Sequence, residues 1–396
     1  MIGFVLIGGE HQLLHIVPVA AELSRRQGIE VVLFAATRQL ADATADLMRR
    51  LESGPYSISV LQLPGMIEHL ARNSVTGGSL KLPRLLAHAR TLRRCGILVT
   101  AERTSTVLKR LPGYCPPMVH LRHGAGDRAV GFERRIALFD DLIVAGEKDR
   151  LRTIEAGLLP PERCHACGYV KLSALRQLRH GAPALFGNDR PTVLYNPHFH
   201  PRLSSWRHAR HVIGAIRDSG LFNLIVAPHV RLFAASDRRH RAAWESLAVP
   251  DQVLVDLGSP RSMDMTYTLA ADLYLGDVSS QVYEFAAEPR PCVFLDSHAA
   301  PWQGNPDYLM WQMGEVVERP EDVLPALLRA GGLHGKYRER QRRLVADAMG
   351  EIGPGAAQRA AQIILDRAAA QVRTVPSKAG GSLARASEGP HRSTIR

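Results

Sequence analysis

Residues 271–285 read Ala271-Asp272-Leu273-Tyr274-Leu275-Gly276-Asp277-Val278-Ser279-Ser280-Gln281-Val282-Tyr283-Glu284-Phe285, an apolar strand that turns directly into a helix. The first N–H groups of a helix have no partner within it, and the helix dipole places partial positive charge there. Serine hydroxyls beside such amides form a phosphate cradle, to which we assign Asp277, Ser279 and Ser280. Glu284 lies one turn after Ser280 on the same helix face, within reach of a ribose diol. The alternative is a plain N-cap, because Asp and Ser favour that position for structural reasons alone.

Length and composition indicate a globular protein of two domains. The chain has 396 residues, of which 45% are apolar and 22% charged, and this is enough for two ordinary cores. Its net charge of +12 suits a nucleotide, a polyanionic polymer or an anionic membrane surface. The sequence has no arginine-rich run interleaved with aromatics, no zinc-finger spacing and no RNA-binding signature, so nucleic acid is not an expected partner.

The sequence favours a cytoplasmic location and offers no membrane span. No stretch approaches about eighteen unbroken apolar residues. Residues 1–9 are a short apolar run without a basic leader, so they are expected to form a first strand and not a signal peptide. Five cysteines, an odd number in a long chain, favour a reducing compartment. Cys164 and Cys167 form a single C-x-x-C without two further ligands at a similar spacing, so no metal and no cofactor is expected.

Strand and helix signals alternate along two parts of the chain. Apolar runs bounded by Gly or Pro and separated by helical patterns predict doubly wound parallel sheets. The expected strands are Ile2–Ile7, Val31–Ala35, Ser57–Gln62, Met118–Leu121, Leu142–Val144, Thr192–Tyr195, Leu224–Ala227, Val253–Val255, Asp272–Leu275 and Cys292–Leu295. We therefore expect an α/β protein with Rossmann-like domains over residues 1–180 and 190–350, a C-terminal helix over 355–373 and a disordered tail over 374–396. The stretch 82–110 is predicted to be one long basic helical region.

Two loops of the first domain are candidate ligand sites. Gly8, Gly9 and His11 follow the first strand, where glycines allow the backbone to approach a ligand closely. The dinucleotide pattern G-x-G-x-x-G is absent, which argues against a Rossmann NAD site. His11 and His15 either line a cleft between the domains or lie on a solvated face.

The loop that begins at His123 carries the more specific signal. His123 and Gly124 follow an apolar strand, at the sheet edge where α/β enzymes place catalytic groups. An imidazole titrates near neutrality and can act as a general base. Arg128 supplies positive charge for an anionic substrate. A loop histidine bonded to backbone is the alternative.

Two strand ends of the second domain carry histidines as well. Tyr195, Pro197 and His198 end one strand, and His229 ends the next. Because the carboxyl ends of parallel strands share one edge, these residues are expected beside the turn at Ser279 and Ser280.

Together these motifs resemble the CDP-glycerol glycerophosphotransferase family, which builds teichoic-acid-type polymers with a two-domain GT-B fold. The order is a His-Gly loop at His123, a Tyr-x-Pro strand end at Tyr195, a Pro-His strand end at His229 and Asp-x-Ser-Ser at Asp277. The family's Lys-x-His-Pro is Ala227-Pro228-His229-Val230 in this chain, and the resemblance spans residues 115–300.

The resemblance implies a transferase that moves a glycerophosphate-type group from a CDP-activated donor to a hydroxyl acceptor, lipid-linked or polymeric. The first domain would bind the acceptor and the second the donor. His123 would deprotonate the acceptor, His229 and the serine turn would hold phosphates, and Glu284, Tyr195 and Pro197 would hold the nucleoside. Gly8, Gly9, His11, Gly124 and His198 would line the cleft.

Three other questions stay open at the level of sequence. The same fold serves glycosyltransferases and epimerases that use UDP- or CDP-sugars, and a non-catalytic nucleotide-binding protein would carry the same cradle. The basic stretch 82–110 favours weak binding to the inner face of the cell membrane, with an ordinary solvated helix face as the alternative.

Overall fold

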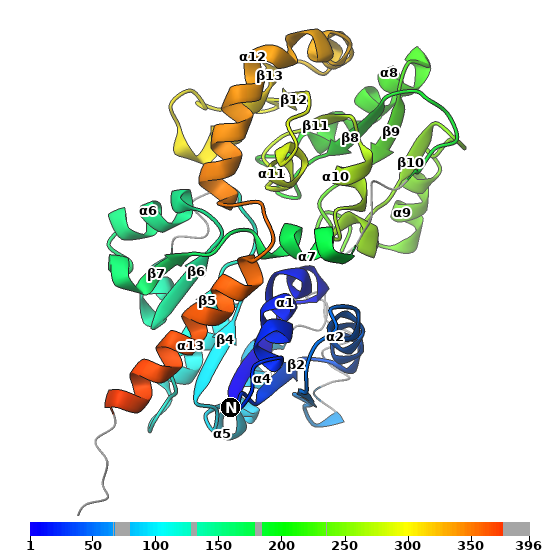
Figure 1. Ribbon diagram of the computed structural model, residues 1–396. Helices are drawn as coiled ribbons and strands as arrows, with labels where there is room; N and C mark the ends of the chain where they lie inside the picture. Colours follow the sequence, from blue (N-terminus) through cyan, green and yellow to red (C-terminus); the bar gives the residue numbers. More distant parts are fainter. Residues whose placement is uncertain (66, 68–79, 128–132, 179–183, 235, 375–396) are drawn as a thin grey trace, which may run out of the picture.

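The computed structural model describes residues 1–65, 67, 80–127, 133–178, 184–234 and 236–374. They form two parallel β-sheets with helices on their faces (Figure 1). The first sheet has the order β3-β2-β1-β4-β5-β6-β7 and the second the order β10-β9-β8-β11-β12-β13. The fold class expected from the sequence is confirmed.

The strands of the two sheets are short, and those inside each sheet are almost wholly buried, whereas the edge strands β3, β7, β10 and β13 are partly exposed. The first sheet contains β1 (Ile2–Leu6), β2 (Val31–Ala35), β3 (Ser57–Val60), β4 (Ile97–Thr100), β5 (Met118–Leu121), β6 (Asp141–Val144) and β7 (Cys164–Ala166). The second contains β8 (Thr192–Asn196), β9 (Asn223–Val226), β10 (Val253–Val255), β11 (Leu273–Gly276), β12 (Cys292–Leu295) and β13 (Glu315–Val317). Continuous apolar runs suit these strands because helices cover both faces of a parallel sheet.

The connections between strands are helical. The α-helices are α1 (Leu13–Ser24), α2 (Arg38–Arg50), α4 (Lys81–Ala87), α5 (Ala89–Leu92), α6 (Glu147–Glu155), α7 (Val170–Leu178), α8 (Ala209–Ser219), α9 (Arg238–Glu245), α10 (Thr266–Ala270), α11 (Gln281–Ala286), α12 (Val323–Met349) and α13 (Ala356–Thr374). The 3-10 helices are η1 (Glu10–Gln12), η2 (Arg103–Arg110), η4 (Arg134–Leu138), η5 (Pro161–Arg163), η6 (Ser205–His208), η7 (Pro260–Ser262), η8 (Pro306–Met313) and η9 (Pro320–Asp322).

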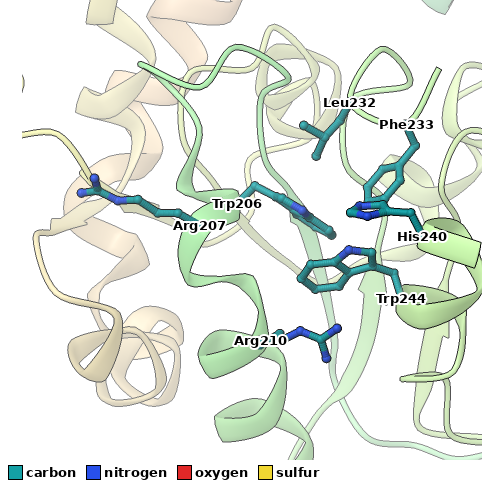
Figure 2. Close-up of a pocket in the computed structure, with 7 residues that line it drawn as sticks. All are labelled: Trp206, Arg207, Arg210, Leu232, Phe233, His240 and Trp244. Carbon is teal, nitrogen blue, oxygen red and sulfur yellow. The ribbon is translucent and has the colours of Figure 1, made fainter. Parts of the chain in front are cut away.

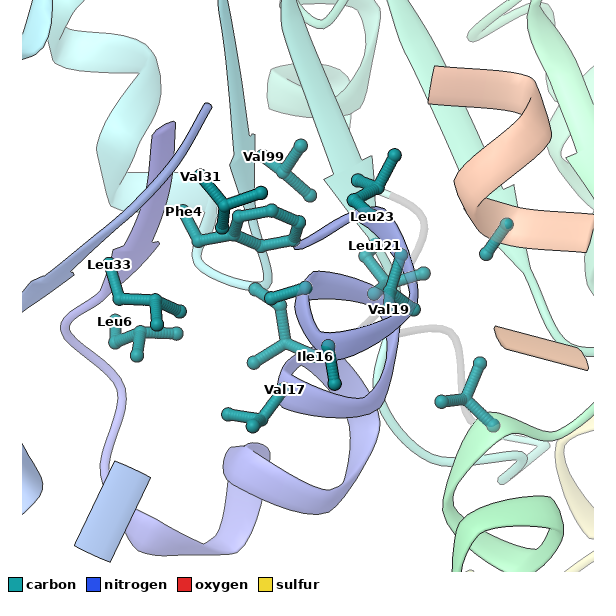
Figure 3. Packing of buried hydrophobic residues seen from close by; sticks show 14 of the residues in the cluster. Phe4, Leu6, Ile16, Val17, Val19, Leu23, Val31, Leu33, Val99 and Leu121 are labelled. Atoms are coloured by element: carbon teal, nitrogen blue, oxygen red, sulfur yellow. The ribbon is translucent and has the colours of Figure 1, made fainter. Parts of the chain in front are cut away.

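Helix α1 anchors the N-terminal core. Ile16, Val17 and Val19 are essentially unexposed and pack with Phe4 and Leu33 of the sheet (Figure 3). The helix is apolar nearly all round because α7 and α13 cover the side that faces away from the sheet. Helix α13 thus returns from the C-terminal part of the chain and lies against the N-terminal sheet (Figure 1).

The prediction of one helical region over 82–110 is wrong. The structure breaks it into α4, α5, β4 and η2, and β4 lies at the centre of the first sheet between β1 and β5. Ile97, Leu98 and Val99 are fully buried. A run of four apolar residues is too short to show helical or strand periodicity, and the basic residues on both sides suggested a continuous helix. Strands β7 and β13, three residues each, were also not predicted.

Candidate functional site

Loops from the carboxyl edges of the two sheets meet between the domains. Gly126, after β5, lies so close to Ser280 that an added Cβ would sit 2.9 Å from the serine Cβ. His11, after β1, lies close enough to Arg231 and His229, after β9, for their charges to interact. The structure therefore brings together motifs that are far apart in the sequence, and we call this region the interdomain site.

His123 extends from the N-terminal domain into the interdomain site. Its ring remains solvent-accessible and lies 5.8 Å from the His11 ring and 6.2 Å from the His15 ring, centroid to centroid. The surrounding protein keeps water away from much of the ring. This desolvation, together with the charge of His11, lowers the pKa of His123 to about 4. The imidazole is thus neutral at pH 7 and can accept a proton.

The histidine within β5, His120, has a structural role. His120 is buried and stacks on Phe139 at 4.7 Å, and its Nδ1 lies 3.1 Å from the Thr100 carbonyl oxygen. Burial lowers the pKa of His120 to about 3. Only His123, of these two, faces the region that a ligand can enter.

The C-terminal domain contributes His229 and His198. Nδ1 of His229 accepts a hydrogen bond from the Arg231 N–H at 3.2 Å, and burial and the Arg231 charge lower its pKa to about 4. A neutral ring that accepts at Nδ1 carries its proton on Nε2 and donates from there. The same geometry recurs at His198, whose Nδ1 accepts from the His200 N–H at 3.0 Å. Pro197 holds this arrangement, because its carbonyl accepts the His229 N–H at 2.9 Å.

Within the turn after β11, Asp277 and Ser279 bind protein rather than facing outward. The buried Asp277 carboxylate accepts N–H groups of His198, Ser205 and Val278 at 2.6–2.8 Å. Burial raises its pKa to about 6 despite these bonds. The Ser279 hydroxyl donates to Asn196 Oδ1 at 2.7 Å. These side chains shape the turn, and neither is directed at a phosphate.

Ser280 is the exposed member of the turn and faces the Gly124–Gly126 loop. Its hydroxyl caps no helical N–H. Within the described part of the chain, the backbone N–H groups of Ser279 and Ser280 donate to no protein acceptor. Gly124 has a φ of +81°, which permits the loop to bend towards Ser280 without strain. The donors at this turn remain available to an anion.

The predicted nucleoside contacts are placed differently from expectation. Glu284 is buried and binds Lys171 Nζ at 2.8 and 2.9 Å and the Tyr169 hydroxyl at 2.6 Å, which joins the two domains. Tyr195 is fully buried, and its hydroxyl binds Ser205. A buried ring offers no face to a ligand, so Tyr195 supports the fold of the C-terminal domain.

Glu102 and its ion-pair partner Lys81 lie near the histidines of the interdomain site and were not predicted from the sequence. Glu102 follows β4 and binds Lys81 Nζ and Gln12 Nε2, both at 2.8 Å. Burial opposes its ionisation, but the Lys81 ammonium and the Gln12 amide hold the pKa of Glu102 below its usual value. Its charge acts on His123. Recognising β4 as a strand would have placed Glu102 at the sheet edge.

The remaining candidates are placed as follows. Gly8 and Gly9 precede η1 and support His11 from the end of β1. Arg128 lies outside the described residues. Among the residues described, no three His, Cys, Asp or Glu side chains gather as a metal site. Burial raises the pKa of Cys164 to about 11 and that of Cys167 to about 12, so both are thiols at neutral pH.

Comparison with known proteins supports the fold through structure alone. No family model and no curated protein matches the sequence. The wall teichoic acid polymerase TagF is similar, with a TM-score of 0.60 and 14% identity over 94% of this chain and 90% of that one. UDP-GlcNAc 2-epimerase from Neisseria meningitidis, bound to UDP-GlcNAc, has a TM-score of 0.58 and 12% identity over 92% and 100%. S. aureus MnaA with UDP has a TM-score of 0.58 and 13% identity over 95% and 97%. The chain therefore has the GT-B-like fold of these enzymes, two Rossmann-like domains that face each other across the interdomain site.

Proposed function

We propose that this protein transfers a glycerophosphate-type group from a CDP-activated donor to a hydroxyl group of a cell-envelope polymer or its lipid-linked precursor. The observation that carries the proposal is the pair of neutral histidines on opposite domains, His123 and His229, with the open amides of Ser279 and Ser280 beside them. The motif resemblance and the likeness to TagF support the same assignment. A histidine-to-asparagine variant of TagF soaked with CDPG has this fold, with a TM-score of 0.59 and 14% identity.

The proposed reaction is a substitution at the β-phosphorus of the donor, with His123 and His229 on opposite sides of the interdomain site. The acceptor oxygen forms a bond to the β-phosphorus, the bond from that phosphorus to the bridging oxygen breaks, and CMP leaves. His123 takes the proton of the acceptor hydroxyl, and the negative charge of the bound donor raises its basicity in the complex. His229 donates from Nε2 to a phosphate oxygen. Substitution at phosphorus depends mainly on alignment and charge stabilisation, which fixed donors provide.

Donor affinity tests the phosphate end of the interdomain site. We expect Ser280→Ala and His229→Ala each to weaken CDP-glycerol binding, because hydrogen bonds to charged groups contribute roughly 1.5–3 kcal/mol. Isothermal titration calorimetry measures this directly. The matched controls are Ser246→Ala, at the exposed C-cap of α9, and His211→Ala, an exposed position on α8. Unchanged affinity in both site variants would mean that neither the Ser280 hydroxyl nor His229 binds the donor phosphates.

A nucleotide-sugar reaction is the second candidate. Glu102 and His123 interact electrostatically, and two titratable groups in one site suit proton transfers at a sugar carbon as well. The UDP-GlcNAc 2-epimerases share the fold at a similar TM-score. A thermal-shift screen separates the two, because a ligand that binds only the native state raises the melting temperature. Stabilisation by UDP-GlcNAc and not by CDP-glycerol would favour the second candidate.

Weak association with the inner membrane face is part of the proposal. Among the described residues, no helix has the length and hydropathy of a membrane span. In the stretch 84–110, Arg84 is buried and Arg93 binds backbone carbonyls, while Arg90, Arg94 and Arg110 are exposed. Each basic residue near an anionic surface contributes about 1 kcal/mol.

Liposome sedimentation tests the membrane proposal. At low salt, anionic vesicles should sediment more of the protein than neutral ones, and high salt should remove the difference. The triple variant Arg90→Ala, Arg94→Ala and Arg110→Ala should lose most of the excess. Equal sedimentation with both vesicle types at low salt would show that these arginines bind no membrane.

A further inference from the structure

A pocket with aromatic and cationic walls lies in the C-terminal domain, apart from the histidines of the interdomain site. It has a volume of about 420 Å³ and contains side chains from η6, α8, α9 and the loop after β9 (Figure 2). Its lining residues are Trp206, Arg207, Arg210, Leu232, Phe233, His240 and Trp244. We call it the aromatic–arginine pocket.

The rings of the pocket hold one another in place. The centroids of Trp206 and Trp244 lie 4.4 Å apart, and Phe233 meets Trp206 edge-on at 5.4 Å. Behind Trp206 stands the buried Tyr195, whose ring is nearly parallel to it at 6.3 Å. Both tryptophans keep part of their surface exposed. Two partly exposed indoles on a buried support form a preformed apolar wall for a ligand.

Positive charge surrounds the pocket. Arg210 lies over the Trp244 ring at 4.6 Å, and Arg207 binds the Ser297 carbonyl on the opposite side. Helix α9 begins with Arg238, Arg239, His240 and Arg241, and the first two side chains are exposed. Arginine favours phosphate oxygens because its planar fork matches their geometry.

The pocket is adjacent to the interdomain site along two short connections. Phe233 follows His229 by four residues, so their Cα atoms lie within about 14 Å of each other. Trp206 follows Ser205, whose N–H and hydroxyl both bind Asp277 of the turn after β11. An acceptor longer than one sugar is long enough to span this distance.

We propose that the aromatic–arginine pocket binds a phosphate-bearing sugar of the acceptor, with the ring against the indoles and the phosphate at the arginines. This proposal rests on the proposed function, since it assigns a subsite to the acceptor. The donor phosphates have separate partners at Ser280 and His229.

Binding of glucose 1-phosphate, measured by calorimetry, tests the proposal. The wild-type protein should bind it, whereas glucose and inorganic phosphate, which each lack one half of the ligand, should bind much more weakly. Trp244→Ala and Arg210→Ala should weaken binding by about tenfold or more, a factor typical of a lost stacking or charged contact. Trp244→Phe should recover part of the affinity because it keeps a ring.

The control is Arg217→Ala, which removes the same charge from the far end of α8, where Arg217 pairs with Asp218. It should bind glucose 1-phosphate as the wild type does. Equal affinity in Trp244→Ala, Arg210→Ala and wild type, or no binding in the wild type, would overturn the proposal. So would CMP or oligothymidylate binding that depends on Trp244, since the pocket would then hold a base. If the wild-type protein does not bind CDP-glycerol, the proposed function is overturned. The measured binding of glucose 1-phosphate would still stand.

Discussion

Replacing His123 with alanine should lower the rate of transfer by about 10²–10⁴-fold, the range lost with a general base, while CDP-glycerol affinity stays nearly unchanged. The imidazole lies on the N-terminal side of the interdomain site, opposite the donor groups of Ser280 and His229. Its pKa of about 4 keeps it neutral at pH 7. kcat/KM, which reports the free enzyme, should therefore be level near neutrality and fall on acidification through that pKa, whereas kcat should fall at a higher pH because the bound donor raises the basicity of His123.

Steady-state kinetics with separate measurement of donor affinity checks this result. His211→Ala, an exposed position on α8, controls for loss of a histidine elsewhere in the protein. A His123→Ala variant that turns over within a few-fold of wild type would remove His123 from the mechanism. Equal loss of donor affinity and rate would instead assign it to donor binding.

Glu284→Gln should lower the free energy of unfolding by about 3–5 kcal/mol, the cost of leaving a buried charge without its partner. The side chains of Glu284 and Lys171 are each only 6% exposed and pair at 2.8 Å between the domains. Lys171 would then lie buried with no carboxylate beside it. Urea unfolding monitored by circular dichroism measures the loss.

The double variant Glu284→Leu with Lys171→Met should recover most of that stability, because an apolar pair of similar volume carries no desolvation cost. A loss below about 1 kcal/mol in Glu284→Gln would show that the pair contributes little. Reduced nucleotide affinity at unchanged stability would restore the ribose role that the sequence assigned to Glu284.

Local patterns in the sequence were sufficient for most of the architecture. The strands predicted from the apolar runs Val31–Ala35 and Met118–Leu121 have the same bounds as β2 and β5. Such runs are informative because buried parallel strands require unbroken apolar residues. The strand-end rule likewise placed His123, His229 and Ser280 at one interdomain region. These predictions needed no knowledge of which segments pair.

The misassigned features depend on contacts between distant residues. β4 is a central strand only because β1 and β5 flank it, and its four residues lie among arginines that suggested a helix. Glu284 has the spacing of a ribose ligand, yet Lys171 lies 113 residues away in sequence and binds it across the domain boundary. The tyrosine of the Tyr-x-Pro motif is buried because Trp206 covers it. No short-range pattern contains such information.

Phosphorus-31 NMR of the protein with CDP-glycerol and a glycerol phosphate-terminated acceptor tests the proposed function most directly. We expect the diphosphate signals to disappear and CMP and a new phosphodiester to appear in equal amounts. Neither product should form without acceptor or with His123→Ala. Intact CDP-glycerol in the presence of acceptor, together with conversion of UDP-GlcNAc under the same conditions, would contradict the proposed function.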